Sequence, residues 1–439
     1  MYDQAIINGK VYLDKKWQYT NIYINQDEIA FISNDLLPAA KVMDVRGYEI
    51  MPGVIDPHVH FELDLGWIKS VDDFYFGSRA AVYGGVTSIV DFLEPVDNEV
   101  DLEKAFHARK VLAEKSMIDY SFHATIKNPK CDLESFVIKM KSLGMHTLKL
   151  FTTYSDSNRR THDEAIIELL KLSKKHKFLI LAHIENDDMI ILNQTLTYQD
   201  LPKSRPTKAE LTEALKLASF VEDTKGYLYM VHVSSGKTLE ALVENFSHLI
   251  NRHFFIESCP QYFTFSHQVL NQMDGYLYTC APPLRPEDER RLLFRYQSYI
   301  QTIGTDHCAF MAKDKMRDKL KDIPLGIGGV EHALAVMRYH FGNEILPKMT
   351  EHVAHIQGLK RKGRIAEGYD ADLIIIDPKF YFISDNHGKC DYSVYQGLDG
   401  FGKVVSTMIR GTLVLDQGQL NAHQGKWIEG GDIDVESHH

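Results

Sequence analysis

The sequence is poor in cysteine, with five in 439 residues: Cys131, Cys259, Cys280, Cys308 and Cys390. They are scattered and form no Cys-x-x-Cys pair, which argues against a disulfide framework and against a cysteine zinc site. Such usage is typical of a reducing compartment. The first residues, MYDQAIINGK, also lack the basic and apolar regions of a secretory signal. We therefore expect a cytoplasmic protein.

Long apolar runs and an excess of positive charge are lacking as well. No stretch is long enough to cross a bilayer. Lys and Arg number 49 against 60 Asp and Glu, a net charge of −11, which repels phosphate backbones and anionic lipid. We therefore expect neither a nucleic-acid nor a membrane partner. What is present, 44% hydrophobic and 25% charged residues, is typical of a globular chain of two or three domains.

Both ends of the chain have the pattern of short β-strands. Alternating or apolar runs separated by turn signals such as Asn8-Gly9 fill residues 1–50, and the pattern returns beyond about residue 360. We expect residues 1–50 and 360–430 to build one small, discontinuous β-sandwich domain. Residues 431–439 are acidic and are expected to form a flexible tail.

The segment between these ends repeats a different unit. Eight short apolar runs without alternation are each followed by a helical stretch, which is typical of parallel strands buried on both faces. This spacing predicts an α/β fold, a (β/α)8 TIM barrel over residues 51–359. An open, doubly wound sheet has the same periodicity and remains the alternative. The runs are Val54–His60, Val86–Phe92, Tyr120–Ile126, Thr147–Phe151, Phe178–Ile184, Leu228–Val233, Phe254–Ser258 and Thr302–Asp306.

Local signals predict where some of the helices begin. Asp132 precedes an amphipathic stretch that Gly144 closes. Thr161 with Glu164, and Thr207 with Glu210, have the spacing of capping boxes, in which the hydroxyl and the carboxylate each accept a hydrogen bond from a free backbone amide.

Six ionisable side chains stand at the ends of five of the predicted strands. Because the carboxyl ends of barrel strands converge on one face, residues far apart in sequence can meet there. Each alone has an ordinary explanation, such as an interior histidine, a lysine at a sheet edge or a helix cap. Together, four imidazoles and a carboxylate are typical of a zinc site or that of a similar divalent metal ion. The set is His58, His60, Lys149, His183, His232 and Asp306.

Lys149 fits such a site only after a chemical change. A protonated ammonium would be repelled by divalent cations, and at a pKa near 10.4 only about 0.04% of the amine is neutral at pH 7. If carbon dioxide adds to the amine, the group becomes a carbamate, whose two oxygens can bridge two metal ions. We therefore expect N6-carboxylysine at Lys149.

At these residues the sequence resembles the amidohydrolase superfamily, and within it the cyclic-amidase branch of hydantoinases and dihydropyrimidinases. The resemblance covers nearly the whole chain. Its motifs are Pro52–Glu62 (PGVIDPHVHFE), Asp72–Phe74, Gly84–Thr87, Lys149–Phe151, His183–Asn186, Ser204–Pro206, Val231–Ser234, Pro282–Arg285 and Gly304–Cys308.

The resemblance implies a mechanism. His58, His60 and Asp306 would hold one metal ion, His183 and His232 the other, both most simply zinc, with carbamylated Lys149 as the bridge. A hydroxide bridging the two ions would open a cyclic amide, a hydantoin or dihydropyrimidine ring, to an N-carbamoyl amino acid. Asp306 would carry the proton, and Tyr154 would stabilise the oxyanion. The resemblance also implies backbone contacts from Ala281 and Gly328 to the substrate, and a homo-oligomer, tetramer or dimer.

Smaller signals bear on the alternatives. Glu62 occupies the position where dihydroorotases carry an arginine, which counts against a dihydroorotase. Ala281, before Pro282 and Pro283, replaces the usual serine and resembles allantoinases. Gly328 stands near the position of an asparagine in hydantoinases. A non-catalytic scaffold of the same fold is a further alternative, but such relatives have lost metal ligands that this chain keeps.

Overall fold

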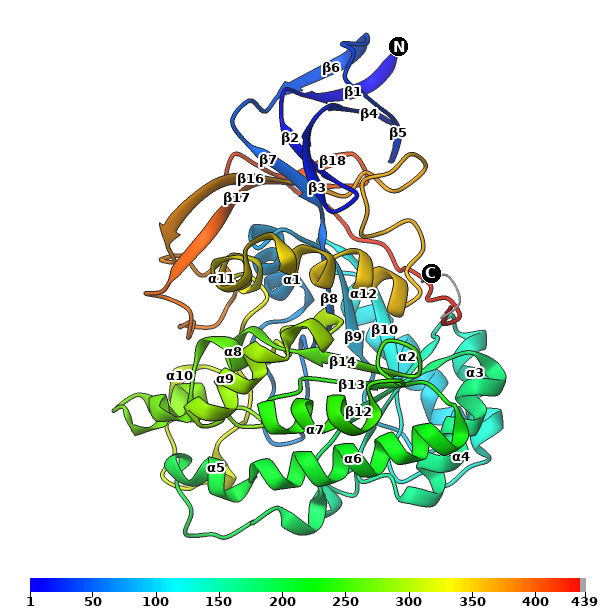
Figure 1. The fold of residues 1–439 in the computed structure, drawn as a ribbon, viewed down its shortest axis with the longest axis vertical. Helices are drawn as coiled ribbons and strands as arrows, with labels where there is room; N and C mark the ends of the chain where they lie inside the picture. The colour runs from blue at the N-terminus through cyan, green and yellow to red at the C-terminus, as the bar shows by residue number, and fades with distance from the viewer. Residues whose placement is uncertain (435–439) are drawn as a thin grey trace.

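The computed structural model describes residues 1–434 of the chain. Eight parallel strands form the centre of the larger part of the protein (Figure 1). The strands are neighbours in chain order, and the last meets the first through a parallel bridge between Val59 and His307. The sheet is therefore a closed barrel, as predicted, and the open-sheet alternative is wrong. The strands are β8 (Val54–Val59), β9 (Val86–Phe92), β10 (Asp119–Thr125), β11 (Thr147–Phe151), β12 (Leu179–His183), β13 (Leu228–Met230), β14 (Phe254–Ser258) and β15 (Thr302–Ile303).

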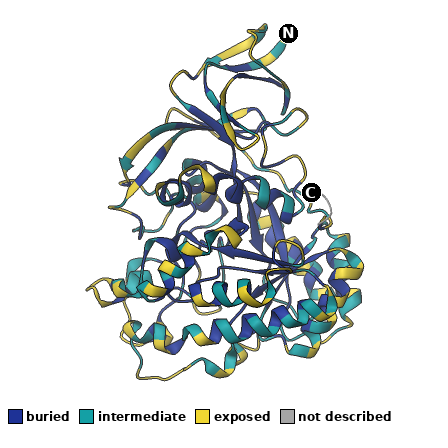
Figure 2. Cartoon of the chain, in the orientation of Figure 1, coloured by how far each residue is buried: buried dark blue, intermediate teal, exposed yellow. Residues whose placement is uncertain are grey.

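Helices surround the barrel and present exposed faces to solvent, while the barrel strands are buried apart from the half-buried Phe151 (Figure 2). This burial on both faces explains why the strand sequences show no alternation. The helices are α1 (Phe74–Tyr83), α2 (Glu99–Ala113), α3 (Leu133–Ser142), α4 (Asp163–His176), α5 (Leu201–Ser204), α6 (Thr207–Thr224), α7 (Gly236–Phe246), α8 (Pro260–Thr264), α9 (Glu287–Arg295), α10 (Ala312–Lys315), α11 (Ala333–Phe341) and α12 (Glu351–Ile356).

The helix starts were predicted with mixed success. Asp132 caps α3 as expected, because its carboxylate accepts from the Ser135 amide at 2.8 Å. Both predicted capping boxes are wrong. The cap of α4 is His162, and α6 begins at Thr207 itself, after Pro206. The Glu210 carboxylate instead accepts from Ser234 and Ser235, so a tertiary contact has replaced the local one.

Strands from both ends of the chain build the sheet part at the top of Figure 1. A four-stranded sheet has the order β5 (Glu28–Ser33), β4 (Asn21–Asn25), β1 (Tyr2–Ile7), β6 (Ala39–Asp44). A seven-stranded sheet has the order β19 (Gln419–Leu420), β18 (Thr412–Asp416), β17 (Asp399–Ile409), β16 (Leu373–Phe382), β7 (Glu49–Pro52), β2 (Lys10–Leu13), β3 (Lys16–Tyr19). An apolar cluster that includes Ile6, Ile24 and Leu373 packs between them, so the predicted discontinuous sandwich is present.

A buried charge cluster joins this sheet part to the barrel. Lys362, whose side chain is 2% exposed, contacts Asp119 at the start of β10 at 2.7 Å, and Asp370 and Asp372 before β16 at 2.9 and 2.6 Å. Arg410 also pairs with Asp119. Three close carboxylates resemble a cation site, but the Lys362 ammonium lies among them, and Arg410 and Arg361 pair with Asp119 and Asp370.

The last described residues, up to 434, lie against the base of the barrel. Trp427 packs on Phe106 and Phe122, with ring centroids 5.3 and 5.0 Å away, and the Ile433 amide donates to the Lys177 carbonyl. The Asp432 carboxylate also contacts Lys141 at 2.8 Å and His146 at 2.7 Å, so these contacts argue against the expected flexible tail over residues 431–434. Residues 435–439 lie outside the described residues.

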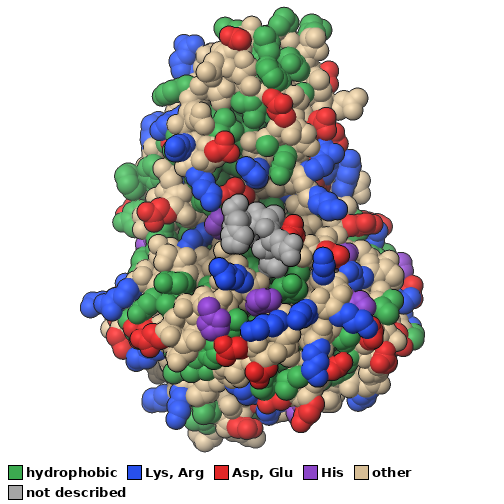
Figure 3. Space-filling model, turned by 45° about the vertical axis from the view of Figure 1, so that its right-hand side comes forward, with side chains coloured by type: hydrophobic (Ala, Val, Ile, Leu, Met, Phe, Trp, Pro, Cys, Tyr) green, Lys and Arg blue, Asp and Glu red, His purple; other side chains and the backbone are tan. Residues whose placement is uncertain are grey.

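The surface charges and the hydropathy of the helices bear on the expectations from the sequence. On the face drawn in Figure 3, acidic and basic side chains are interspersed rather than separated into large areas of one sign. Among residues 1–434, no helix combines the length and the hydropathy needed to cross a bilayer.

Candidate metal centre

Three of the predicted ligands converge at the mouth of the barrel. The His58 and His60 Nε2 atoms lie 3.2 Å apart, and Asp306 Oδ1 lies 3.1 and 3.2 Å from them. Ligand atoms about 2.0–2.1 Å from a tetrahedral zinc ion are about 3.3 Å from one another. The three atoms therefore already have the spacing of one face of such a site.

The barrel closure creates this group. His58 and His60 alternate along the end of β8, and Asp306 follows β15, the strand that closes the barrel against β8. Asp306 is held in the left-handed region at φ 52°, where a non-glycine residue is strained. Gly304 lets the backbone before Asp306 lie close to Glu257, because a Cβ at Gly304 would lie 2.7 Å from the Glu257 carboxylate.

Glu257 holds the first ligand and was missed by the sequence analysis. Its Oε1 lies 2.8 Å from His58 Nδ1 and accepts from the His232 amide at 3.0 Å, while Oε2 accepts from the Tyr229 hydroxyl. A carboxylate on the far ring nitrogen fixes which nitrogen of a histidine faces a metal. Burial lowers the pKa of His58, but the charges of Glu257 and Asp306 raise it to about 9. The carboxylates therefore make this pocket attractive to a cation.

The other two histidines lie next to this group. The His183 and His232 ring centroids are 4.6 Å apart, and His232 is 5.5 Å from His58. His183 Nε2 contacts Glu185 at 2.7 Å, which leaves the lone pair of Nδ1 free to bind a metal ion. Burial lowers the pKa of His183 to about 4 and that of His232 well below its usual value. Both rings are thus held neutral, the form that binds metal ions.

Lys149 belongs to the same cluster. Its side chain is buried, and Nζ lies 5.2 Å from the centroid of Phe92, whose ring packs 4.8 Å from His58 and 4.6 Å from His60. Within the described residues Nζ has no hydrogen-bond or ion-pair partner. Burial lowers the pKa of Lys149 to about 8. About a tenth of the amine is then neutral at pH 7, which favours reaction with carbon dioxide.

Tyr154 lies beside the second histidine pair, after the end of β11. Its ring is 5.1 Å from His183, and the Arg205 guanidinium lies over it at 4.9 Å. The backbone at Tyr154 is left-handed, with φ 71°. Burial raises the pKa of Tyr154 to about 12, so the hydroxyl stays protonated at neutral pH and can donate a hydrogen bond.

The two predicted substrate contacts are in separate loops that meet. Gly328 lies beside His307, the residue after Asp306: a Cβ at Gly328 would lie 3.3 Å from the His307 ring. Ala281 precedes Pro282, whose carbonyl accepts from the Tyr262 hydroxyl at 2.9 Å. The loops are joined by a hydrogen bond from the Gly326 amide to the Thr279 carbonyl.

The fold and the histidine–aspartate cluster are those of a metal-dependent hydrolase. Residues 50–414 match the model of the amidohydrolase family, and the chain belongs to that family. Amidohydrolases generally use a binuclear metal centre with a carbamylated lysine, and His58, His60 and Asp306 form a candidate metal site in this chain.

Named relatives place the chain within the family. It is 29% identical to a D-phenylhydantoinase of Escherichia coli over 417 residues, 89% of each chain. Its structure is similar to that of a dihydropyrimidinase from Brevibacillus agri, with a TM-score of 0.92 and 26% identity, covering 98% of this chain and 99% of the other. It is also similar to a D-hydantoinase from a Bacillus species, with a TM-score of 0.93 and 27% identity, covering 98% and 100%.

Proposed function

We propose that this protein hydrolyses a cyclic amide, a hydantoin or dihydropyrimidine ring, to an N-carbamoyl amino acid. The observation that carries the proposal is the convergence of His58, His60 and Asp306 at the mouth of the barrel. The names of the relatives, D-phenylhydantoinase, D-hydantoinase and dihydropyrimidinase, supply the substrate class.

The residues fit two divalent metal ions, which we propose to be zinc. His58, His60 and Asp306 would hold one, His183 and His232 the other, and carbamylated Lys149 would bridge them. Two such ions supply a water of lowered pKa and polarise the amide carbonyl. Three features support this fit: the ligand spacing of 3.1–3.2 Å, the neutral His183 and His232 rings, and the buried Lys149 amine, which has no hydrogen-bond or ion-pair partner within residues 1–434.

Two side chains would manage the charges that develop during hydrolysis. Asp306 accepts the proton of the attacking water and delivers it to the departing ring nitrogen, acting first as base and then as acid. Tyr154 donates its hydroxyl proton in a hydrogen bond to the oxyanion, an interaction typically worth about 3–4 kcal/mol. Backbone groups near Ala281 and Gly328 would hold the ring.

A substrate panel tests the proposal. Hydantoin, dihydrouracil, allantoin and dihydroorotate are offered to protein loaded with zinc, and ring opening is followed with metal content measured in parallel. We expect turnover of hydantoin or dihydrouracil with two ions per chain. Preference for allantoin would instead support the alternative that Ala281 favours. Absence of both metal and turnover would favour a scaffold.

Lys149→Ala tests the bridge. Without the carbamate the two ions lose their shared ligand, so we expect metal content to fall to one ion or fewer and turnover to fall with it. A short-chain carboxylic acid added to the variant supplies a replacement anion and should restore part of both. Lys141→Ala, a partly exposed lysine on α3 far from the ligands, serves as the control. Two ions and normal turnover in Lys149→Ala would refute the carbamate.

Assembly and location are also proposals. We expect a homo-oligomer, tetramer or dimer, which light scattering on the purified protein measures directly. A cytoplasmic location is supported by the five cysteines, all of which are free thiols.

A further inference from the structure

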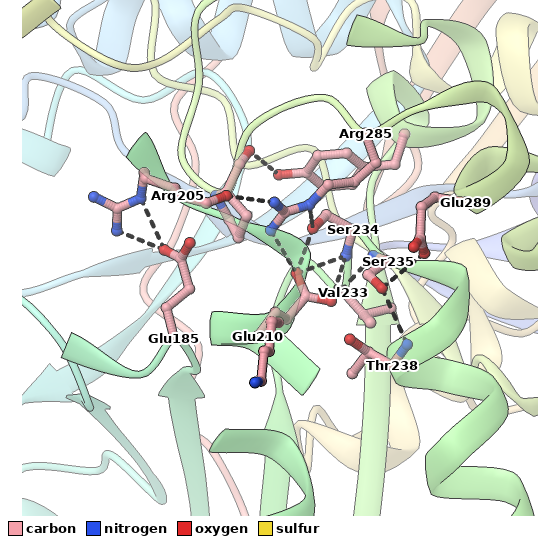
Figure 4. A network of polar contacts seen from close by, with 12 residues as sticks. Glu185, Arg205, Glu210, Val233, Ser234, Ser235, Thr238, Arg285 and Glu289 are labelled. Carbon is pink, nitrogen blue, oxygen red and sulfur yellow. Dashed lines mark hydrogen bonds and ion pairs between the residues drawn. The ribbon is translucent and has the colours of Figure 1, made fainter. Parts of the chain in front are cut away.

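One oxygen of a buried carboxylate holds two different groups beside the candidate metal centre. Glu185 is fully buried, and its Oε2 accepts from His183 Nε2 at 2.7 Å and from Arg205 Nε and Nη2 at 3.0 and 2.5 Å. The other oxygen, Oε1, has no hydrogen-bond partner among residues 1–434. The oxygen that contacts His183 is therefore the same one that pairs with Arg205, and Figure 4 shows Glu185 turned toward the Arg205 guanidinium.

The same guanidinium also contacts the predicted oxyanion donor. Arg205 is 4% exposed, and its Cζ lies 4.9 Å from the centroid of the Tyr154 ring. A planar guanidinium can pair with a carboxylate along its edge while stacking on an aromatic face, which a lysine cannot do. Arg205 thus links His183, through Glu185, with Tyr154.

Arg205 is itself fixed by a second buried arginine. Its carbonyl accepts from Arg285 Nη1 at 2.6 Å, and Arg285 Nε donates to the Ser234 hydroxyl at 2.9 Å. Ser234 follows His232 by two residues and its amide donates to Glu210 (Figure 4). The network therefore joins the end of β12, which carries His183, to the segment after β13, which carries His232.

We propose that Arg205 is a positioning residue that sets the second metal position and the oxyanion donor together. Through Glu185 it keeps the proton of His183 on Nε2, so that Nδ1 faces the metal. Through its stack it holds the Tyr154 ring beside His183. The inference rests on the proposed function and deepens it, because it names one residue on which two parts of the site depend.

The experiment separates the two routes. Zinc affinity is measured by chelator competition for wild type, Arg205→Met and Glu185→Gln, and kcat is measured at saturating zinc with and without Tyr154→Phe. We expect Arg205→Met and Glu185→Gln each to weaken the second ion by about 10–100-fold. In wild type and in Glu185→Gln, we expect Tyr154→Phe to lower kcat by the full effect of an oxyanion donor, about 10²–10³. In Arg205→Met, whose tyrosine is already misplaced, we expect it to lower kcat only a few-fold.

Arg290→Met is the matched control. Arg290 also pairs with a carboxylate, Glu287 at 2.8 Å, and lies 5.5 Å over a ring, that of Phe294, but on α9 away from the ligands. Arg290→Met should change neither the zinc affinity nor the effect of Tyr154→Phe on kcat. If Arg205→Met does not fold, it is replaced by Arg205→Lys, which keeps the charge and loses the planar edge. We then expect the same changes in zinc affinity and in the effect of Tyr154→Phe, but smaller ones.

The outcomes distinguish the inference from the function. Zinc affinity equal to wild type in Arg205→Met, together with an undiminished effect of Tyr154→Phe, overturns the positioning role while the proposed function stands. A wild-type protein that binds two ions but opens no cyclic amide refutes the function, and the metal affinities still decide the His183 route. A wild-type protein that binds no zinc overturns both.

Discussion

At the scale of single residues, the candidate site is marked by backbone strain. Tyr154, His232 and Asp306 have φ values of 71°, 41° and 52°, in a region that costs non-glycine residues about 1–3 kcal/mol each. Such conformations persist only when the surroundings over-determine them. Here the barrel ends and the buried carboxylates supply that constraint, which places strained residues where the proposed chemistry occurs.

Tyr154→Phe is the sharpest prediction at this scale. Removing one oxyanion donor typically costs about 10²–10³ in rate, so we expect kcat to fall by that factor while the zinc content stays at two ions. Because burial raises the pKa of Tyr154 to about 12, the hydroxyl does not titrate near neutrality. The variant should therefore keep the wild-type pH–rate profile between pH 6 and 9, measured by steady-state kinetics. A profile that loses its alkaline limb would contradict this role.

At the scale of elements, one lysine ties together the two predicted substrate loops. Lys315, at the end of α10, is fully buried and donates to the Thr279 and Gly326 carbonyls at 2.8 and 2.5 Å. Within the described residues it has no carboxylate partner. A buried ammonium held only by carbonyls is costly. We interpret it as a clamp that fixes the backbone near Ala281 and Gly328.

Lys315→Met should therefore loosen substrate binding and leave the metal centre intact. Loss of the two hydrogen bonds leaves buried carbonyls unpaired, at about 1–3 kcal/mol each. We expect KM to rise by about tenfold or more while the zinc content stays unchanged. Lys313→Met, a surface change on the same helix, is the control. An unchanged KM in Lys315→Met would show that the loops hold their positions without the clamp.

The same lysine gives a pH dependence of stability. Burial lowers the pKa of Lys315 to about 8, below the value near 10.4 expected in the unfolded chain. Between these values the unfolded state binds more protons, so this residue makes the free energy of unfolding rise as the pH rises from about 8 to 10. Urea unfolding at several pH values should show that Lys315→Met lacks this part of the rise.

At the scale of the whole molecule, the link between the barrel and the sheet part depends on Lys362. Burial alone would raise the pKa of Asp119, but Lys362 and Arg410 hold it below its ordinary value. Lys362 is also the only cation that contacts both Asp370 and Asp372 among the described ion pairs. Replacing it leaves the buried Asp372 and Asp119 and the partly buried Asp370 close together with one cation fewer.

Lys362→Met should destabilise the protein by about 3–5 kcal/mol at pH 7, because a buried ion pair broken on one side leaves uncompensated charge. Urea unfolding measures the loss. The deficit should shrink as the pH falls from 7 to 4, since the carboxyl groups left without Lys362 take up protons in the variant and no longer repel one another. Lys360→Met, an exposed change nearby, is the control. A deficit that is independent of pH would contradict the electrostatic explanation.

The sequence alone predicted the eight barrel strands to within a few residues, because strands buried on both faces are uninterrupted apolar runs. It also predicted that His58, His60 and Asp306 meet, since strand ends converge in a barrel. It failed where a residue's partner is distant. Glu210 has the spacing of a helix cap but bonds to Ser234, and nothing local marks Glu257 as the holder of His58.

Residue identity and spacing thus determined the fold class and the chemical types available for a metal site, because hydrophobic periodicity and ligand chemistry are local properties. Only the tertiary structure decided that the barrel closes, which ring nitrogen of His58 and of His183 is taken by a carboxylate, and that Arg205 contacts Glu185 and Tyr154 at once. These are matters of distance and orientation between strands, and packing of the whole chain fixes them.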